Sequence, residues 1–408
     1  MPVRFDNMAL EAEPPQAPLL WRWLLILVLM LVSGLAAAFL YSTEPLQEQG
    51  MRFWGLFCGL PLLCWSMLVS GRVLLHIGQR NVADGWNQAR AEDLQRRRSL
   101  GRRSLQLLAS SGHSPLREQG VGTAPMQMQR LPDEGRLIRS QPCRLQQRPV
   151  RHSQLSGDSP DPELLLLERL TCVLAELAEA LGKLPADTPL AFLFETESGL
   201  PEGTLRKVWR EAWRRSGIRQ SMQPLQGSGL AAVDLWLDQR LDDRALLLVL
   251  AFQFAPKHPI NTAEAVVGVL LGNHQTQVTL SPVAVLHRPQ QSSEVTTEAL
   301  TVAAGRALDW AKLGSESIEG LWQVGIASST RATLSASLDE LCMPDAAVGR
   351  LRDLDSALGH PGPASPWLAI SLAAQAIRQG GGAQFIFTGS GPEDNGLWSV
   401  ALTPAPLL

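Results

Sequence analysis

The chain has 408 residues and a formal net charge of −3. It is therefore too long for one average domain and too weakly charged for a general nucleic-acid binder. Its five cysteines follow neither a disulfide framework nor a metal-ligand spacing with histidine, so we expect no metal site and no cofactor.

Two uncharged apolar segments follow an N-terminal tail that covers residues 1–18. They span residues 23–43 and 53–71 within the region 19–76, and each has the length of about 20 residues that a helix needs to cross a bilayer. A cleaved signal peptide fits poorly, because the first run is too long for its apolar region and a second run follows directly. We therefore expect a two-helix transmembrane hairpin, with the lipid bilayer as a partner.

Basic residues after the second segment predict the orientation of this hairpin. The region 77–103 has the pattern of a basic juxtamembrane helix with five closely spaced arginines, Arg96, Arg97, Arg98, Arg102 and Arg103. Arginine near a membrane end keeps a segment in the cytoplasm. We expect a bacterial inner-membrane protein with both termini in the cytoplasm. The arginines either contact anionic headgroups or only set the orientation, and the two interpretations are compatible.

From residue 104 onward the pattern changes to that of an α/β protein. A strand is expected at 105–110, followed by an irregular insertion over residues 111–160 that is rich in Pro, Gly, Ser, Gln and Arg. The expected helices are 163–184, 203–216, 228–240, 295–312 and 366–379, and the expected strands are 190–194, 245–254, 263–271, 278–286 and 321–327, with an antiparallel pair 384–388 and 397–403. This alternation predicts a layered sheet that is covered on both faces.

Two stretches of the α/β region resemble a known family. The run SALGHPGPASPWLAISLAAQAIRQG (residues 356–380) resembles the C-terminal signature of β-ketoacyl synthases, in which a turn ending in Gly-His leads into an alanine-rich helix. Residues 227–253 are similar to the family's nucleophile helix and the strand after it. The resemblance implies a thiolase-like domain of two repeats over residues 104–408.

The same resemblance implies that the family's chemistry is lost. The nucleophilic cysteine belongs at a helix N-terminus, which stabilises a thiolate, and that position is Gln226 here. The first catalytic histidine would fall within residues 325–330, around the degenerate position Ser328, where there is no histidine. Only His360 is retained. Family members with Gln for Cys decarboxylate, but they keep both histidines, so we expect no enzyme. His360 is interpreted as a satisfied turn residue, with ligand binding as the alternative.

Two further groups of side chains have both a functional and a structural interpretation. Glu195 and Glu197 follow a strand and could form an acid/base pair, although solvated carboxylates are favoured. Trp209 and Trp213 lie four residues apart on the basic helix 203–216. They could form a protein-docking face, although an ordinary amphipathic helix is favoured.

Three functions are compatible with these features. The first is a non-catalytic membrane-anchored adaptor, and the order of its segments loosely resembles accessory proteins of bacterial type VI secretion systems. That resemblance implies a secretion component or an effector as the protein partner, with an immunity role as a related possibility. The second is an acyl-group-binding, acyl-transfer or decarboxylase enzyme at the membrane that uses His360. The third is a structural membrane subunit that only oligomerises, for example as a homodimer.

Overall fold

The computed structural model describes residues 9–41, 50–117, 137–157, 159–241, 243–273, 275, 280–389 and 396–406. Parts of the expected N-terminal tail, of the first apolar segment and of the insertion at 111–160 lie outside these residues. The chain forms two compact units, a helical unit (Arg4–Arg98) and an α/β unit that contains Ser99–Leu408. Each unit is described by itself.

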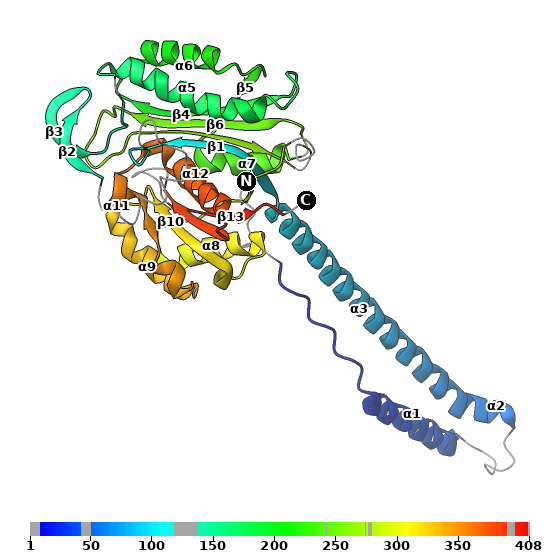
Figure 1. Ribbon diagram of the computed structural model, residues 1–408. Helices are drawn as coiled ribbons and strands as arrows, with labels where there is room; N and C mark the ends of the chain where they lie inside the picture. Colours follow the sequence, from blue (N-terminus) through cyan, green and yellow to red (C-terminus); the bar gives the residue numbers. More distant parts are fainter. Residues whose placement is uncertain are drawn as a thin grey trace. The chain divides into compact units, whose positions relative to one another are not determined.

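The helical unit consists of α1 (Leu20–Tyr41), the short α2 (Met51–Trp54), a π-helical turn (Gly55–Gly59) and α3 (Leu60–Gly101) as far as Arg98 (Figure 1). Two helical stretches, Leu20–Leu40 and Gly55–Gly101, are long and apolar enough to cross a membrane by length and composition. The sequence predicts separate spanning and juxtamembrane helices, whereas α3 runs through both regions without interruption. Its interior contains glycine but no proline after Pro61, and glycine weakens a helix by only about 1 kcal/mol.

The α/β unit is built on one large mixed sheet whose strands form two repeats. Its order is β5-β4-β6-β7-β1 followed by β8-β13-β12-β10-β11, and β1 and β8 join antiparallel at the seam. The first repeat contains β1 (Ser104–His113), β4 (Leu190–Ser198), β5 (Met222–Pro224), β6 (Leu246–Phe254) and β7 (Ala265–Gly272). The second contains β8 (Ala284–His287), β10 (Ile318–Val324), β11 (Arg352–Asp353), β12 (Ala383–Thr388) and β13 (Trp398–Pro404), with β9 (Gln290–Gln291) beside β13.

The helices are also divided between the two halves of the sheet. The first half contains α5 (Pro162–Leu181), α6 (Glu202–Ser216) and α7 (Gly229–Gln239). The second contains α8 (Thr297–Ala311), α9 (Arg331–Glu340), α10 (Asp345–Val348), α11 (Leu354–Leu358) and α12 (Ser365–Arg378). Figure 1 shows α5 and α6 outside one half of the sheet, α8 and α9 outside the other, and α7 and α12 between the halves. In each half the inner pair, β4 with β6 and β10 with β12, is parallel.

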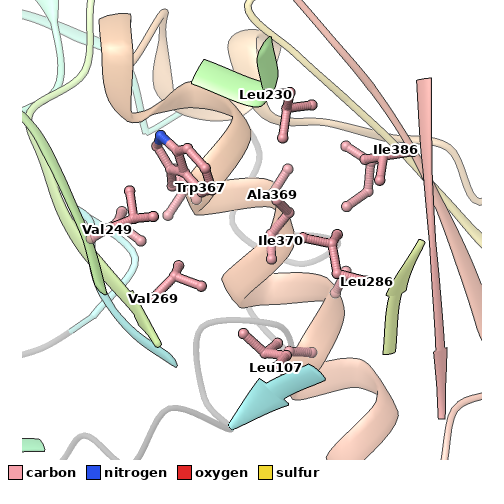
Figure 2. Close-up of a cluster of buried hydrophobic side chains, with 14 of the residues drawn as sticks. Leu107, Leu230, Val249, Val269, Leu286, Trp367, Ala369, Ile370 and Ile386 are labelled. Carbon is pink, nitrogen blue, oxygen red and sulfur yellow. The ribbon is translucent and has the colours of Figure 1, made fainter. Parts of the chain in front are cut away.

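Three hydrophobic clusters fill the spaces between these layers. The central cluster surrounds α12, where Trp367, Ala369 and Ile370 lie among residues of both sheet halves, such as Val249 and Ile386 (Figure 2). A second cluster lies beneath α5 and α6, and a third beneath α8 and α9. Because both faces of the strands are buried, β6 and β12 are almost continuously apolar. The layered α/β class predicted from the sequence is thus observed.

The expected irregular insertion contains a regular element. Residues 139–143 (β2) and 146–152 (β3) pair as an antiparallel hairpin in which Pro142 lies opposite Pro149. The strands could not be predicted from the sequence, because the segment is polar and contains prolines, which within sheets occur mainly in edge strands. The hairpin is fastened by Arg144, whose Nε lies 2.9 Å from an oxygen of the buried carboxylate of Glu264.

Candidate functional site

The candidate site lies at the carboxyl ends of the parallel strands, where open α/β sheets usually bind ligands. In the first half, β4 and β6 end close to the loop that leads into α7. In the second half, β10 ends at the loop 325–330. The turn that carries His360 follows α11 and leads into α12. The three positions that the family resemblance singles out, Gln226, Ser328 and His360, belong to these loops.

At the start of α7, the helix N-terminus is occupied by a side chain of the protein itself. The main-chain N–H of Gly229 donates to one carboxylate oxygen of Glu195, and the indole Nε1–H of Trp367 donates to the other oxygen at 2.7 Å. Glu195 is only 8% exposed and Trp367 is fully buried. Burial raises the pKa of Glu195, while the bonds from Trp367 and Gly229 oppose that rise. The carboxylate therefore joins β4, α7 and α12.

The position expected for a nucleophile is displaced from this carboxylate and faces solvent. Gln226 and Ser228 are both exposed, and the Ser228 side chain makes no capping bond to α7. A helix N-terminus stabilises negative charge through its free N–H groups and its dipole. Here Glu195 accepts one of those N–H groups, so a carboxyl group of the protein itself uses a donor that a bound anion would otherwise use.

The second half shows a related arrangement at the end of β10. The carboxylate of Asp355 on α11 accepts from the main-chain N–H of Gly325 at 2.9 Å and of Ile326 at 2.8 Å. Burial raises the pKa of Asp355, and the two backbone bonds oppose that rise. Ser328 lies in the following 3₁₀ turn and is exposed. The loop that would carry the first catalytic histidine is thus held by a carboxylate.

His360 is tied into its turn chiefly through its backbone. Its N–H donates to the carbonyl of Asn261 at 2.8 Å, and its carbonyl accepts from Ala263 N at 2.9 Å and from the buried Gln253 Nε2 at 2.7 Å. The ring Nδ1 accepts from the N–H of Gly362 at 2.9 Å. The ring Nε2 is buried and has no hydrogen-bond partner among the described atoms. His360 is therefore held in its turn by backbone and Nδ1 hydrogen bonds, while Nε2 has no hydrogen-bond partner among the described atoms.

The remaining predicted site residues are two tryptophans of α6 and five arginines in and just after the end of α3. Trp209 stacks on Phe192 of β4 with ring centroids 4.9 Å apart, and Trp213 lies 5.5 Å from Trp209. Both are half-buried against the sheet, as in an amphipathic helix, so their docking role stays a prediction. Arg103 donates from Nη1 to the carbonyls of Leu237 and Asp238 at 2.9 and 3.2 Å. The Arg103 guanidinium therefore contacts the end of α7 within the α/β unit. The side chains of Arg96, Arg98 and Arg102 are exposed, and Arg97 forms an ion pair with Asp93.

The expectation that Glu195 is solvated is wrong, although Glu197 is exposed. The signal that could have found Glu195 is the two-residue period of β4. Ala191 and Leu193 face the central cluster, while Leu190 and Phe192 face α5 and α6. Side chains alternate along a strand, so residue 195 points into the central layer. Among the described residues, no group of three or more His, Cys, Asp or Glu side chains is arranged to hold a metal ion.

Comparisons with known proteins identify the fold. No family model matches the sequence, and no curated protein matches it. The ishigamide ketosynthase/chain length factor superposes with a TM-score of 0.54 and 13% identity over 74% of this chain and 99% of that chain. The Streptomyces albus oxazolomycin ketosynthase domain KS7 superposes with a TM-score of 0.51 and 12% identity over 75% of each chain. The ketosynthase from module 6 of the Bacillus subtilis bacillaene synthase superposes with a TM-score of 0.50 and 9% identity over 74% of this chain and 71% of that chain. The α/β unit therefore has the thiolase-like fold.

Proposed function

We propose that this protein is a non-catalytic, membrane-anchored adaptor that binds a protein partner through a pseudo-ketosynthase domain. One observation carries the proposal: the Glu195 carboxylate occupies the N-terminus of α7, while Gln226 is exposed at the nucleophile position. Acyl transfer in this fold needs a nucleophile and preorganised donors for the developing oxyanion. Gln226 cannot form an acyl-enzyme, and Glu195 accepts the N–H of Gly229.

The proposed anchor is the pair of apolar helices in the helical unit. The polar part of α3 contacts the residues before α1, since Asn87 makes two hydrogen bonds with Ala12. Two crossings between these positions return the chain to the side on which it began, which fits this contact. The arginines at 96–98 favour the cytoplasm for that side. We propose a bacterial inner-membrane location with both termini cytoplasmic and the bilayer as a partner.

For the protein partner we propose a component or an effector of a type VI secretion system. The support is the order of segments, in which two apolar helices and an arginine-rich helix end precede an α/β unit. A fold alone does not identify a partner, so the proposal predicts a complex that forms in membranes. Co-purification of the tagged full chain with one secretion component, in a ratio that survives detergent exchange, is the expected result.

An acyl-binding or decarboxylating enzyme is the second candidate, and one observation favours it. The Nε2 of His360 is buried without a hydrogen-bond partner among the described atoms, and a buried polar atom in that state costs about 1–3 kcal/mol unless something satisfies it. A ligand carbonyl near the start of α12 would be a suitable acceptor for an Nε2–H.

Thioester turnover separates the two candidates. The full chain in detergent micelles would be incubated with malonyl and acyl thioesters, and carbon dioxide and free thiol would be measured. We expect no turnover above that of buffer, and no difference between the natural chain and His360→Ala. A rate that falls on His360→Ala would establish the enzyme instead. Independently, a C-terminal reporter that is active only in the periplasm would overturn the proposed topology.

A further inference from the structure

The residues before α1 lie along α3 and are held there by hydrogen bonds to their backbone. Residues 9–19, here called the strap, form neither helix nor strand. The side-chain Nδ2 of Asn87 donates to the carbonyl of Ala12 at 3.1 Å, and its Oδ1 accepts from the N–H of Ala12 at 2.9 Å. A side-chain amide that both donates to and accepts from the backbone of one residue makes the same pair of hydrogen bonds that two facing residues exchange in an antiparallel sheet.

Two neighbouring side chains of α3 bind the strap in the same way. The Trp86 Nε1–H donates to the carbonyl of Leu10 at 3.1 Å, and Arg90 Nε donates to the carbonyl of Ala9 at 2.9 Å. Arg90 also forms an ion pair with Glu11 at 3.7 Å, and the Glu11 side chain is 71% exposed. All four hydrogen bonds therefore go to main-chain atoms, so the binding depends on the path of the strap more than on its side chains.

The composition of the strap explains why it is extended. It contains Pro14, Pro15 and Pro18, and its half-buried residues Ala12, Pro15 and Pro18 recur at every third position. A three-residue period is that of the polyproline II helix, which docks on surfaces that contain aromatic side chains.

On α3, Ala83 is buried and lies on the same helical face as Asn87 and Arg90, at spacings of four and seven residues. Ala83, Trp86, Asn87 and Arg90 are here called the docking stripe.

The strap leaves space beside its first described residue. A hollow of about 140 Å³ is lined by Ala9, Trp86, Ala89, Arg90, Asp93 and Leu94. The Ala9 methyl group does not fill it, and the neighbouring Leu10 side chain is 89% exposed. A segment with a larger apolar residue in place of Ala9 would bury that side chain against Trp86 and Leu94. The resident strap is therefore a suboptimal ligand for the docking stripe.

We propose that the docking stripe is a binding site for an extended, proline-rich segment of a partner protein, and that the strap occupies it in cis as a displaceable ligand. A partner segment with the same backbone path would make the same four hydrogen bonds. A larger side chain at the position of Ala9 would add the contact that the strap lacks. The site lies in the helical unit and goes beyond the proposed function, because it does not depend on the chemistry of the α/β unit.

Peptide binding to the full chain in detergent micelles tests the proposal. The probe is a fluorescent peptide of residues 8–19, and its anisotropy would be measured with the natural chain and with a variant that lacks residues 2–17. We expect saturable binding to the deletion variant and at least tenfold weaker binding to the natural chain, whose strap competes. A peptide with Ala9→Leu should bind several-fold more tightly. Equal binding to both proteins, or none to the deletion variant, would overturn the proposal.

Matched variants in the deletion background establish where the peptide binds. Asn87→Ala should weaken binding at least tenfold, whereas Asn81→Ala, an exposed asparagine of the same helix, should leave it unchanged. A peptide with its three prolines replaced by glycine should bind more weakly, because a flexible chain loses more entropy on ordering. Unchanged binding by Asn87→Ala, with unchanged helix content by circular dichroism, would contradict the assignment of the docking stripe.

Discussion

The two halves of the α/β unit satisfy the polar groups at their strand ends in opposite ways. In the first half the strand β4 supplies the carboxylate of Glu195, and the donors come from α7 and α12. In the second half α11 supplies the carboxylate of Asp355, and the donors are the backbone amides that follow β10. In both halves, backbone N–H groups near the strand ends are thus bonded to a buried carboxyl group of the protein itself. Satisfied donors of this kind stabilise the fold but are not available to a substrate.

Replacing Glu195 tests the first half and should have the largest effect. Glu195→Ala leaves the Trp367 indole N–H and the Gly229 N–H without their acceptor in a buried site. At about 1–3 kcal/mol for each unsatisfied group, with a cavity in addition, we expect a loss of about 3–5 kcal/mol in the free energy of unfolding.

Urea unfolding of the full chain, followed by tryptophan fluorescence, would measure this loss. Glu197→Ala is the matched control on the same strand, because Glu197 is exposed, and it should change stability by less than about 0.5 kcal/mol. Equal effects of the two substitutions would show that Glu195 does not join the layers.

Replacing Asp355 tests the second half and should have a smaller effect. Asp355→Ala removes the acceptor of two backbone amides, but these donors lie in the loop after β10 and not on α7 and α12. We expect a loss of about 2–4 kcal/mol by the same measurement. The control is Asp339→Ala on the exposed face of α9. If Asp355→Ala cost more than Glu195→Ala, the ranking of the two halves would be reversed.

The seam between the halves supplies a pH-dependent prediction. Burial lowers the pKa of His287 on β8 to about 4, whereas an unfolded histidine titrates near 6.5. Between these values the unfolded chain binds more protons, so this residue should cost up to about 3 kcal/mol of stability as the pH falls from about 6.5 to 4. Above about pH 6.5 it should have no effect.

Urea unfolding of the natural chain and of His287→Gln at several pH values would isolate this contribution. The difference between the two proteins should change with pH only within that window. His258→Gln, at an exposed histidine, should reproduce the natural profile. A pH-independent difference for His287→Gln would indicate that the ring is solvated in the folded state.

The sequence predicts the layered fold well because burial on both faces leaves a strong apolar signal. β6 and β7 are continuously buried, and apart from Gln253 their sequences are apolar. The hairpin of β2 and β3 lacks that signal, since it is polar, contains prolines and is held in part by the ion pair of Arg144 with Glu264. A long-range partner of this kind cannot be inferred from local periodicity.

The candidate site was predictable only where the resemblance supplied positions. Gln226, Ser328 and His360 lie on loops at strand and helix ends, as the resemblance implies. The buried, hydrogen-bonded roles of Glu195 and Asp355 were not predicted, because they depend on donors that lie 30 or more positions away along the chain in all but one case. The membrane-surface role was also assigned by sequence position alone and stays a prediction, and the contact of Arg103 with carbonyl groups at the end of α7 could not be inferred from that position.

The central proposal is that residues at the strand ends, Gln226 among them, do not accept an acyl group. Intact-protein mass spectrometry of the full chain after incubation with acetyl and malonyl thioesters, followed by peptide mapping, tests it most directly. We predict no acyl group on residues 226–229 or 325–330, and no added acyl mass on either the natural chain or His360→Ala. An acyl group mapped to Ser228 or Ser328, and absent from His360→Ala, would contradict it.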